Sequence, residues 1–301
     1  MTAEFGSPIE ILRPMRSSAP VVLSSPHSGQ IYPPSLLRDT RLHPHQLRRL
    51  EDAFVNRLFD MAPSLGAPML QARFARAFVD VNREAFEFDP DTLDGPLPAY
   101  ANGQSAKARA GLGTIPSRLS GQPIYRSRLS LSEVERRVRM AYWPYHHALQ
   151  QLIDEGRSRF GKVMLLDCHS MPSFNANGAL SRGGQKGGMI DIALGDRFGK
   201  SCSPSIMRCA EAVLEEHGLK VARNRPYAGG YITTHYGQPS IGVHALQIEI
   251  RRGLYMDESR LRLHNTLDGI RGAMQSLLEA LIDVMNNAVL PIHHDEALPA
   301  E

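Results

Sequence analysis

Two histidines lie just beyond apolar runs that are typical of buried strands, where ligand-binding residues gather in open α/β sheets. His27 stands in the segment SSPHSG after the apolar residues 20–23, and His169 stands in LLDCHSMP after residues 163–166. Neutral imidazole is the commonest nitrogen ligand of zinc, and a catalytic zinc site usually has three protein ligands and one water. A single histidine at a strand end is more often a hydrogen-bonded structural residue, but two at equivalent positions make shared metal binding a comparable alternative.

A carboxylate is the expected third ligand, and the chain offers Glu51 and Asp52. Both lie midway along residues 45–62, a segment that we expect to be helical because its apolar residues recur at helical spacing. These residues are Leu47, Leu50, Phe54, Leu58 and Met61. The spacing does not choose between the two acids, and a solvated acidic pair beside Arg48 and Arg49 is an equal alternative.

Glu249 is an acid in a segment that is otherwise suited to burial. In LQIEI it shares one face of the expected strand with Gln247, while the apolar residues share the other face. Such an acid must be hydrogen-bonded, paired with Arg251 or Arg252, or catalytic. Glu249 is therefore a candidate general base.

Asn82 and Arg83 end the segment RAFVDVNR, which reads as a strand. A planar guanidinium can hold a carboxylate through two parallel hydrogen bonds, and a neighbouring amide can complete the clamp. The alternative is a surface arginine at a strand end. Other chemistry finds no support, because the sequence has no Gly-x-Ser-x-Gly elbow and no CxxC pair.

The elements that must position these residues follow an α/β rhythm. Strands are expected at residues 20–23, 77–81, 163–167 and 245–250. The clearest helix begins at Ser132, which has Glu135 at the capping-box spacing, and runs to about residue 160. Further helices are expected at residues 203–218 and 258–285. This alternation predicts a largely parallel or mixed sheet that is covered by helices on both sides.

The length and composition are those of one globular domain over residues 1–301, with long irregular excursions near residues 86–122 and 175–188. The net charge is only +3 and no long Lys/Arg block occurs, which argues against nucleic acid or a membrane surface as a partner. No apolar run approaches the roughly 20 residues that span a bilayer. We expect a cytoplasmic protein, and the sequence carries no signal for a particular oligomeric state.

Six segments, taken in order from about residue 19 to 260, resemble the N-formylglutamate amidohydrolase (deformylase) family. They are SSPHSGQIYP, RLEDAFVNRLFD, ARAFVDVNRE, LLDCHSMP, PYAGGYITTHYG and ALQIEIRRGLYMDE. The family is distantly similar to the zinc carboxypeptidases and aspartoacylase, which share a three-layer α/β/α fold with a mixed central sheet. The resemblance therefore implies a zinc-peptidase-like fold for this chain.

The resemblance also implies a metal centre. It suggests His27, Asp52 and His169 as ligands of Zn²⁺, with Co²⁺ or Mn²⁺ as alternatives, and Glu249 as the catalytic carboxylate. Asp52 is the acid that matches when VNRLFD is aligned with the family's helix. The wider peptidase group takes its carboxylate ligand three residues after the first histidine, and this position is Gln30 here, so the acid must come from elsewhere.

The substrate that the resemblance implies is a small anionic acyl amino acid. Asn82–Arg83 is similar to the pair with which the relatives hold a substrate carboxylate. Glutamate has two carboxylates, so a second cationic anchor is expected. The candidates are Arg223 and Arg225, before PYAGGYITTHYG, and Arg252. Tyr231 and His235 are expected to line the same pocket.

The implied reaction is metal-dependent hydrolysis of N-formyl-L-glutamate to formate and L-glutamate, a step of histidine degradation. Two alternatives keep the chemistry and change the acyl group: an aspartoacylase-like deacylase of N-acyl amino acids, or an amidase acting on cell-wall peptides. A third alternative is a non-catalytic ligand-binding protein on the same fold. The joint presence of metal-ligand candidates and a candidate general base argues against it.

Overall fold

The computed structural model describes residue 4, residues 6–173 and residues 189–287. Within this part of the chain, seven strands form one mixed sheet in the order β1-β3-β2-β6-β9-β7-β8. The strands are β1 (Ile9–Leu12), β2 (Val21–Ser25), β3 (Met69–Ala72), β6 (Val163–Met171), β7 (Ile192–Gly195), β8 (Val221–Arg223) and β9 (Val243–Arg251). Two small hairpins pair β4 (Arg118–Leu119) with β5 (Gln122–Pro123), and β10 (Met256–Asp257) with β11 (Arg262–Leu263).

The centre of the sheet is parallel. Strands β3, β2, β6 and β9 run in the same direction, whereas β1 is antiparallel to β3 and β7 is antiparallel to β9. The longest pairing joins β6 to β9 and sets His169 opposite Glu249. Because β2, β6 and β9 are parallel neighbours, their carboxyl ends open at one edge of the sheet, where the candidate residues of these strands meet.

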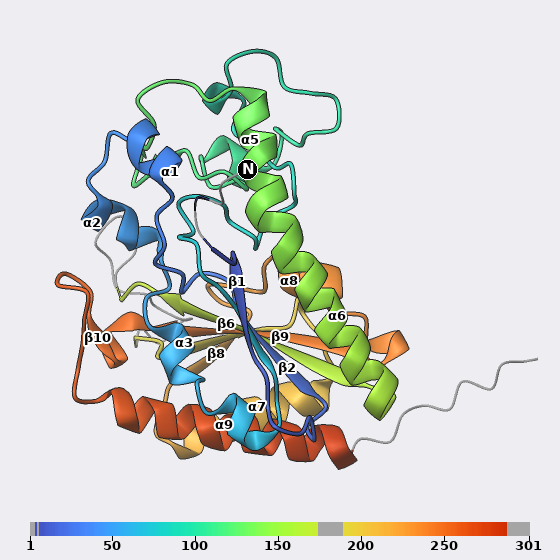
Figure 1. Ribbon diagram of the computed structural model, residues 1–301. Helices are drawn as coiled ribbons and strands as arrows, with labels where there is room; N and C mark the ends of the chain where they lie inside the picture. The colour runs from blue at the N-terminus through green and yellow to red at the C-terminus, as the bar shows by residue number, and fades with distance from the viewer. Residues whose placement is uncertain (1–3, 5, 174–188, 288–301) are drawn as a thin grey trace, which may run out of the picture.

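Helices cover both faces of the sheet (Figure 1). They are α1 (Pro34–Asp39), α2 (Pro44–Leu47), α3 (Val55–Leu58), α4 (Ala106–Arg109), α5 (Leu131–Arg137), α6 (Trp143–Phe160), α7 (Pro204–Glu216), α8 (Tyr231–Tyr236) and α9 (Leu267–Asn287). A π-helical turn, η4 (Val138–Tyr142), joins α5 to α6, and 3-10 turns occur at η1 (Arg48–Leu50), η2 (Ala62–Leu65), η3 (Pro90–Thr92), η5 (Pro239–Ile241) and η6 (Arg252–Leu254).

Two large hydrophobic clusters lie on opposite faces of the sheet. One joins Val22 and Leu165 to apolar residues of α6 such as Leu149. The other joins Leu23 and Leu166 to apolar residues of α7 and α9. The alternation along β2 and β6 sends neighbouring side chains to opposite faces, as a doubly covered sheet requires. The expected three-layer α/β/α arrangement with a mixed central sheet is confirmed.

Residues 45–62 do not form the single helix that their spacing predicts. The segment breaks after η1, resumes at α3, and has Phe54 in the left-handed region with φ 65°. The physical reason is that its apolar residues belong to different cores: Leu47 packs in the cluster of α6, and Leu58 in the cluster of α7 and α9. The chain crosses the sheet edge between them, at Glu51 and Asp52.

The strand expected at residues 77–81 is also wrong. This run is buried but irregular, and its carbonyl and amide groups bond outside the sheet. The Asp80 amide donates to the Thr114 carbonyl at 2.8 Å, and the Val81 carbonyl accepts from His146 Nε2 at 2.9 Å. Burial alone therefore explains the apolar run.

Other element boundaries shift in smaller ways. The last helix starts at Leu267 rather than near residue 258. Residues 86–122 form a long and mostly irregular excursion in which the regular elements are η3, α4, β4 and the first residue of β5. The second expected excursion, residues 175–188, lies outside the described residues.

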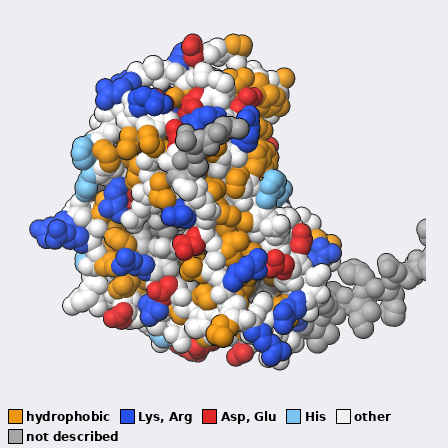
Figure 2. Space-filling model, in the orientation of Figure 1, with side chains coloured by type: hydrophobic (Ala, Val, Ile, Leu, Met, Phe, Trp, Pro, Cys, Tyr) orange, Lys and Arg blue, Asp and Glu red, His pale blue; other side chains and the backbone are white. Residues whose placement is uncertain are grey.

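Charged side chains of both signs are interspersed on the face shown in Figure 2, as the small net charge leads one to expect. None of the helices in the described part of the chain combines the length and the apolar character needed to cross a bilayer.

The N-cap of α5 is Ser130 rather than Ser132. The Ser130 hydroxyl accepts a hydrogen bond from the Glu133 amide at 3.2 Å. We expect Ser130→Ala to lower the free energy of unfolding by about 1 kcal/mol, because an amide at the helix start loses its acceptor. Urea denaturation checks this value.

Ser132→Ala is the matched control, since both variants lose the contact between the two hydroxyls at 3.0 Å. A control variant that loses as much stability as Ser130→Ala would contradict the assignment of the cap.

Candidate active site

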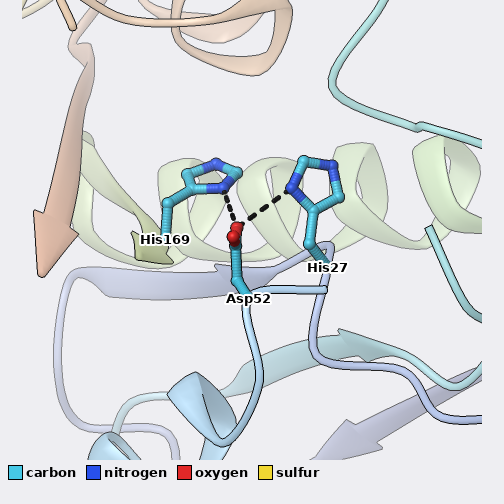
Figure 3. A group of neighbouring side chains, drawn as sticks. All are labelled: His27, Asp52 and His169. Carbon is cyan, nitrogen blue, oxygen red and sulfur yellow. Dashed lines mark hydrogen bonds and ion pairs between the residues drawn. The ribbon is translucent and has the colours of Figure 1, made fainter. Parts of the chain in front are cut away.

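His27, Asp52 and His169 converge at the carboxyl edge of the parallel strands (Figure 3). His27 follows β2, His169 lies within β6, and Asp52 comes from the crossing segment between η1 and α3. One oxygen of Asp52, Oδ2, lies 3.1 Å from His27 Nδ1 and 2.9 Å from His169 Nδ1. The potential ligand atoms all lie within 4.8 Å of one another, so the group could hold one metal ion.

Each imidazole is fixed from behind by a second carboxylate. His27 Nε2 lies 2.8 Å from Asp80 Oδ1, and His169 Nε2 lies 2.9 Å from Asp167 Oδ2. A histidine that binds a metal usually donates its other ring N–H to a carboxylate or carbonyl, which fixes the tautomer and the ring orientation. The contacts here leave Nδ1 of both rings directed to the shared centre.

The backbone places Asp52 between the rings. The Asp52 amide donates to the His27 carbonyl at 2.9 Å, which ties the crossing segment to the end of β2. Arg252 holds the same segment from the other side, because its Nη2 lies 2.6 Å from the Glu51 carbonyl and 3.1 Å from Asp52 Oδ1. Glu51 itself turns away and pairs with Tyr32 and Arg48. Of the two acids, Asp52 is the one whose carboxylate faces the histidines.

The two imidazoles are surrounded by buried carboxylates. Burial by itself would raise the pKa of the Asp52 carboxyl, but hydrogen bonds to His169 and His27 hold this pKa well below its usual range. Burial would likewise lower the pKa of His169, but the carboxylates of Asp167 and Asp52 hold it well above the ordinary value. Four buried carboxylates surround two imidazoles here, at positions 52, 80, 167 and 249. This donor set suits a divalent cation, which needs nitrogen and oxygen ligands and compensates buried negative charge.

Glu249 stands beside this centre on β9, opposite His169. Its Oε1 accepts a hydrogen bond from Gln247 Nε2 at 2.9 Å. Burial raises the pKa of the Glu249 carboxyl to about 7; the positive charge of His169 opposes this rise and the negative charge of Asp52 adds to it. Arg251 and Arg252 have other partners, Asp191 at 2.6 Å and Asp52 at 3.1 Å, so pairing with these arginines does not explain the buried acid.

A cavity of about 420 Å³ opens over these residues. Its lining includes His27, Asp52, His169 and Glu249 and is otherwise rich in cations. The cationic residues are Arg49, Arg76, Arg83, Lys107, Arg197 and Arg252. Charges gathered in a cleft raise the local concentration of oppositely charged ligands, so this cavity favours a small anion.

Comparison with known proteins agrees with this geometry. The family model described as N-formylglutamate amidohydrolase matches residues 19–256, which include both histidines, Asp52 and Glu249. The chain belongs to the N-formylglutamate amidohydrolase family. It is an amidohydrolase that acts on a linear amide.

Three relatives illustrate the extent of the likeness. The N-formylglutamate deformylase of Pseudomonas aeruginosa is 31% identical over 281 residues, which cover 91% of this chain and 96% of the relative. That of Pseudomonas putida is 31% identical over 248 residues, covering 80% and 83%. The crystal structure of N-formylglutamate amidohydrolase from Ralstonia eutropha JMP134 superposes with a TM-score of 0.84 at 34% identity, covering 93% and 97%.

In this family member, the Asn82–Arg83 pair lines the cavity as the sequence suggests. Asn82 is fixed through its Oδ1, which accepts from the Ile232 amide at 2.8 Å. Arg83 donates to the carbonyls of Leu112 and Asn82 at 2.8 and 2.7 Å. Both side chains are thus positioned before any ligand arrives.

Four other expected substrate contacts are not brought to the cavity, as far as the described residues define it. Arg223 is paired with Glu211 on the surface, and Arg225 is exposed. Tyr231 and His235 stack on each other with ring centroids 5.0 Å apart on α8. The segment PYAGGYITTHYG reaches the cavity through its first residues, from Pro226 to Gly230. Arg252 does line the cavity, but its guanidinium is engaged by Asp52 and Ser170.

Sequence reasoning missed several residues of the site. They are Asp80, Asp167, Arg76, Lys107, Arg197, Tyr227 and Gln247. A signal existed for the two aspartates, because each lies in a motif already singled out and a ligating histidine needs an acceptor behind it. No comparable signal marks Lys107 and Arg197.

Asp80 is expected to orient His27 for metal binding. In Asp80→Asn the acceptor behind His27 Nε2 loses its charge, so we expect the affinity for a divalent metal to fall by about 10- to 100-fold. Isothermal titration of the metal-free protein with Zn²⁺, in competition with a chelator, measures this change.

Asp94→Asn, which removes an exposed carboxylate, serves as the control. Equal metal affinities of the Asp80 variant and the unaltered protein would show that Asp80 does not support the ligand.

Proposed function

We propose that this enzyme hydrolyses N-formyl-L-glutamate to formate and L-glutamate with the help of a divalent metal ion, preferably Zn²⁺. The observation that carries the proposal is the convergence of His27, Asp52 and His169 beside Glu249 in a cationic cavity. The deformylase names of relatives that align over most of the chain support the same substrate. The resemblance would place the reaction in histidine degradation.

The metal would be held by Nδ1 of both histidines and by the Asp52 carboxylate. Two imidazoles and one carboxylate, with a further position open to the cavity, suit zinc, and Co²⁺ or Mn²⁺ could take the same donors. When bound, the ion supplies a water that is acidic enough to ionise near neutral pH and a Lewis acid for the formyl carbonyl. Asp80 and Asp167 keep both rings in the orientation that this role requires.

Glu249 acts as the general base and then as the general acid. A formamide resists hydrolysis because its carbonyl is resonance-stabilised and its nitrogen is a poor leaving group. Glu249 takes the proton of the attacking water and returns it to the departing nitrogen. Its raised pKa suits both transfers near neutral pH, because a carboxyl of pKa about 7 gains and loses a proton with little cost there.

Arginines bind and polarise the substrate. Arg83 is held by two main-chain carbonyls and has further N–H groups for a carboxylate, for which we propose the α-carboxylate of the substrate. Arg76 is fixed by Asp80, with Nη2 2.8 Å from Oδ2, and adds positive charge to the cavity in which the formyl oxygen gains negative charge.

A metal analysis joined to a product-release assay tests the proposal against its alternatives. Formate release from N-formylglutamate is expected, with much slower acyl release from N-acetylglutamate and N-acetylaspartate. Preference for an acetyl substrate would indicate an aspartoacylase-like deacylase, and release only from peptide amides would indicate a cell-wall amidase. Ligand binding without any turnover would indicate a binding protein.

Glu249→Gln should abolish most turnover while leaving the fold and the metal content intact. The amide keeps the size of the side chain and its contact with Gln247 but cannot accept the proton, so kcat is expected to fall by about 10² to 10⁴. Steady-state formate release and thermal melting on one preparation provide the measurement.

Glu279→Gln on the exposed face of α9 is the control. A Glu249→Gln variant that melts early yet turns over normally would remove Glu249 from the mechanism.

Arg83→Lys should weaken substrate binding although the positive charge is retained. An ammonium cannot reproduce the planar fork, and the loss of two aligned charged hydrogen bonds costs about 2 to 4 kcal/mol. We therefore expect a raised KM, measured by the same formate assay. Arg128→Lys on the surface controls for general effects of the exchange. An unchanged KM would move the carboxylate anchor to another cation.

A further inference from the structure

Arg197 is a cation of the cavity whose charge is not matched within the described part of the chain. It follows β7 and lines the cavity together with Gly229 and Glu249. Its side chain makes one long hydrogen bond, from Nη1 to the Gly229 carbonyl at 3.5 Å, and no ion pair is found for it among residues 6–173 and 189–287. A partly buried guanidinium with most of its donors free is prepared for an external anion.

The other buried arginines of the cavity are already committed. Arg76 is ion-paired with Asp80, and Arg252 bonds to Asp52 and Ser170. Lys107 and Arg49 are more exposed. Arg197, which lines the cavity beside Gly229, therefore remains available to bind an anionic group of a ligand.

The backbone around Arg197 is held in an unfavourable conformation. Arg197 and Phe198 both lie in the left-handed region, with φ 55° and 58°, followed by Gly199 at 80°. Left-handed non-glycine residues cost energy and persist where the surroundings fix them, often at functional sites. Here the Arg197 amide donates to the Ala228 carbonyl at 2.8 Å, and Asn224 bonds to Asp196 at 2.8 Å. This turn fixes the origin of the Arg197 side chain.

Two glycines separate Arg197 from the Asn82–Arg83 pair. A Cβ on Gly229 would lie 2.9 Å from Arg197 Cδ, and a Cβ on Gly230 would lie 2.4 Å from Asn82 Nδ2. Side chains at these positions would displace one or the other group. The glycine pair therefore lets two polar anchors approach the same short stretch of backbone from different sides.

We propose that Arg197 binds the γ-carboxylate of the substrate, while Arg83 holds the α-carboxylate. This assignment rests on the proposed function and adds the residue that selects a dicarboxylate. A substrate with an amide in place of the γ-carboxylate would leave the Arg197 charge without a partner, which a site built for a charged group rejects strongly.

Arg197→Asn tests the assignment, because asparagine tolerates the left-handed conformation and lacks the charge. We expect kcat/KM for N-formylglutamate to fall by about 100-fold, and kcat/KM for N-formylglutamine to change by less than about threefold. The preference for the acid over the amide should shrink accordingly. Arg197→Lys should restore part of this preference.

Arg223→Asn is the matched control, since Arg223 ends the neighbouring strand β8 and is paired on the surface. It should leave both substrates unaffected. If Arg197→Asn lowers kcat/KM for both substrates equally, Arg197 holds the α-carboxylate or supports the fold, and the proposal is wrong. Unchanged values for both substrates would also overturn it.

Binding of glutarate and butyrate, measured by calorimetry on unaltered protein and variants, gives a readout that does not depend on turnover. The unaltered protein should prefer the dicarboxylate, and Arg197→Asn should lose this preference. If the unaltered protein releases no formate from N-formylglutamate, the proposed function fails. The glutarate preference then decides the role of Arg197 alone, and a variant that retains this preference refutes it.

Discussion

The structure depends on one buried carboxylate that two imidazoles share. Asp52 lies within 3.1 Å of Nδ1 of both His27 and His169, and removing such a charge from water is costly unless every side of it is bonded. Arg252 Nη2 and the Ser170 hydroxyl bond to its other oxygen, Oδ1, at 3.1 and 3.5 Å. Asp80 and Asp167, which bond to the far nitrogens of the two rings, are also buried and also need a partner for their charge. The polar centre is therefore a connected network rather than a set of separate contacts.

The fold meets this requirement through the direction of its strands. Three parallel neighbours, β2, β6 and β9, open at one edge and deliver His27, His169 and Glu249. The acid that joins them comes from a connection that passes over this edge. The residues that we propose to hold the substrate come from irregular segments. One of these is the buried run that ends in Asn82 and Arg83, which hydrogen bonds to α6 and to the excursion keep in place.

Much of the arrangement follows from the sequence, and the exceptions have physical causes. Apolar runs at strand positions and the histidines beyond them predict the centre of the sheet and its functional edge. The single helix predicted for residues 45–62 is wrong, because the spacing of apolar residues does not show in which of the two hydrophobic clusters each residue packs. The sequence pointed to Arg223 as a second anchor and did not single out Arg197. Only the turn after β7 shows which of the two arginines reaches the cavity.

The segment between η1 and α3, which carries Asp52, makes formation of the site depend on both hydrophobic layers at once. Leu47 on one side of Asp52 is anchored in one hydrophobic cluster, and Leu58 on the other side is anchored in the opposite cluster. Opening of either layer would move the shared carboxylate, so the site exists only in states in which both layers are closed. A ligand that binds there draws the equilibrium toward those states by mass action. The two layers on opposite faces of the sheet are in this way coupled through this short connection.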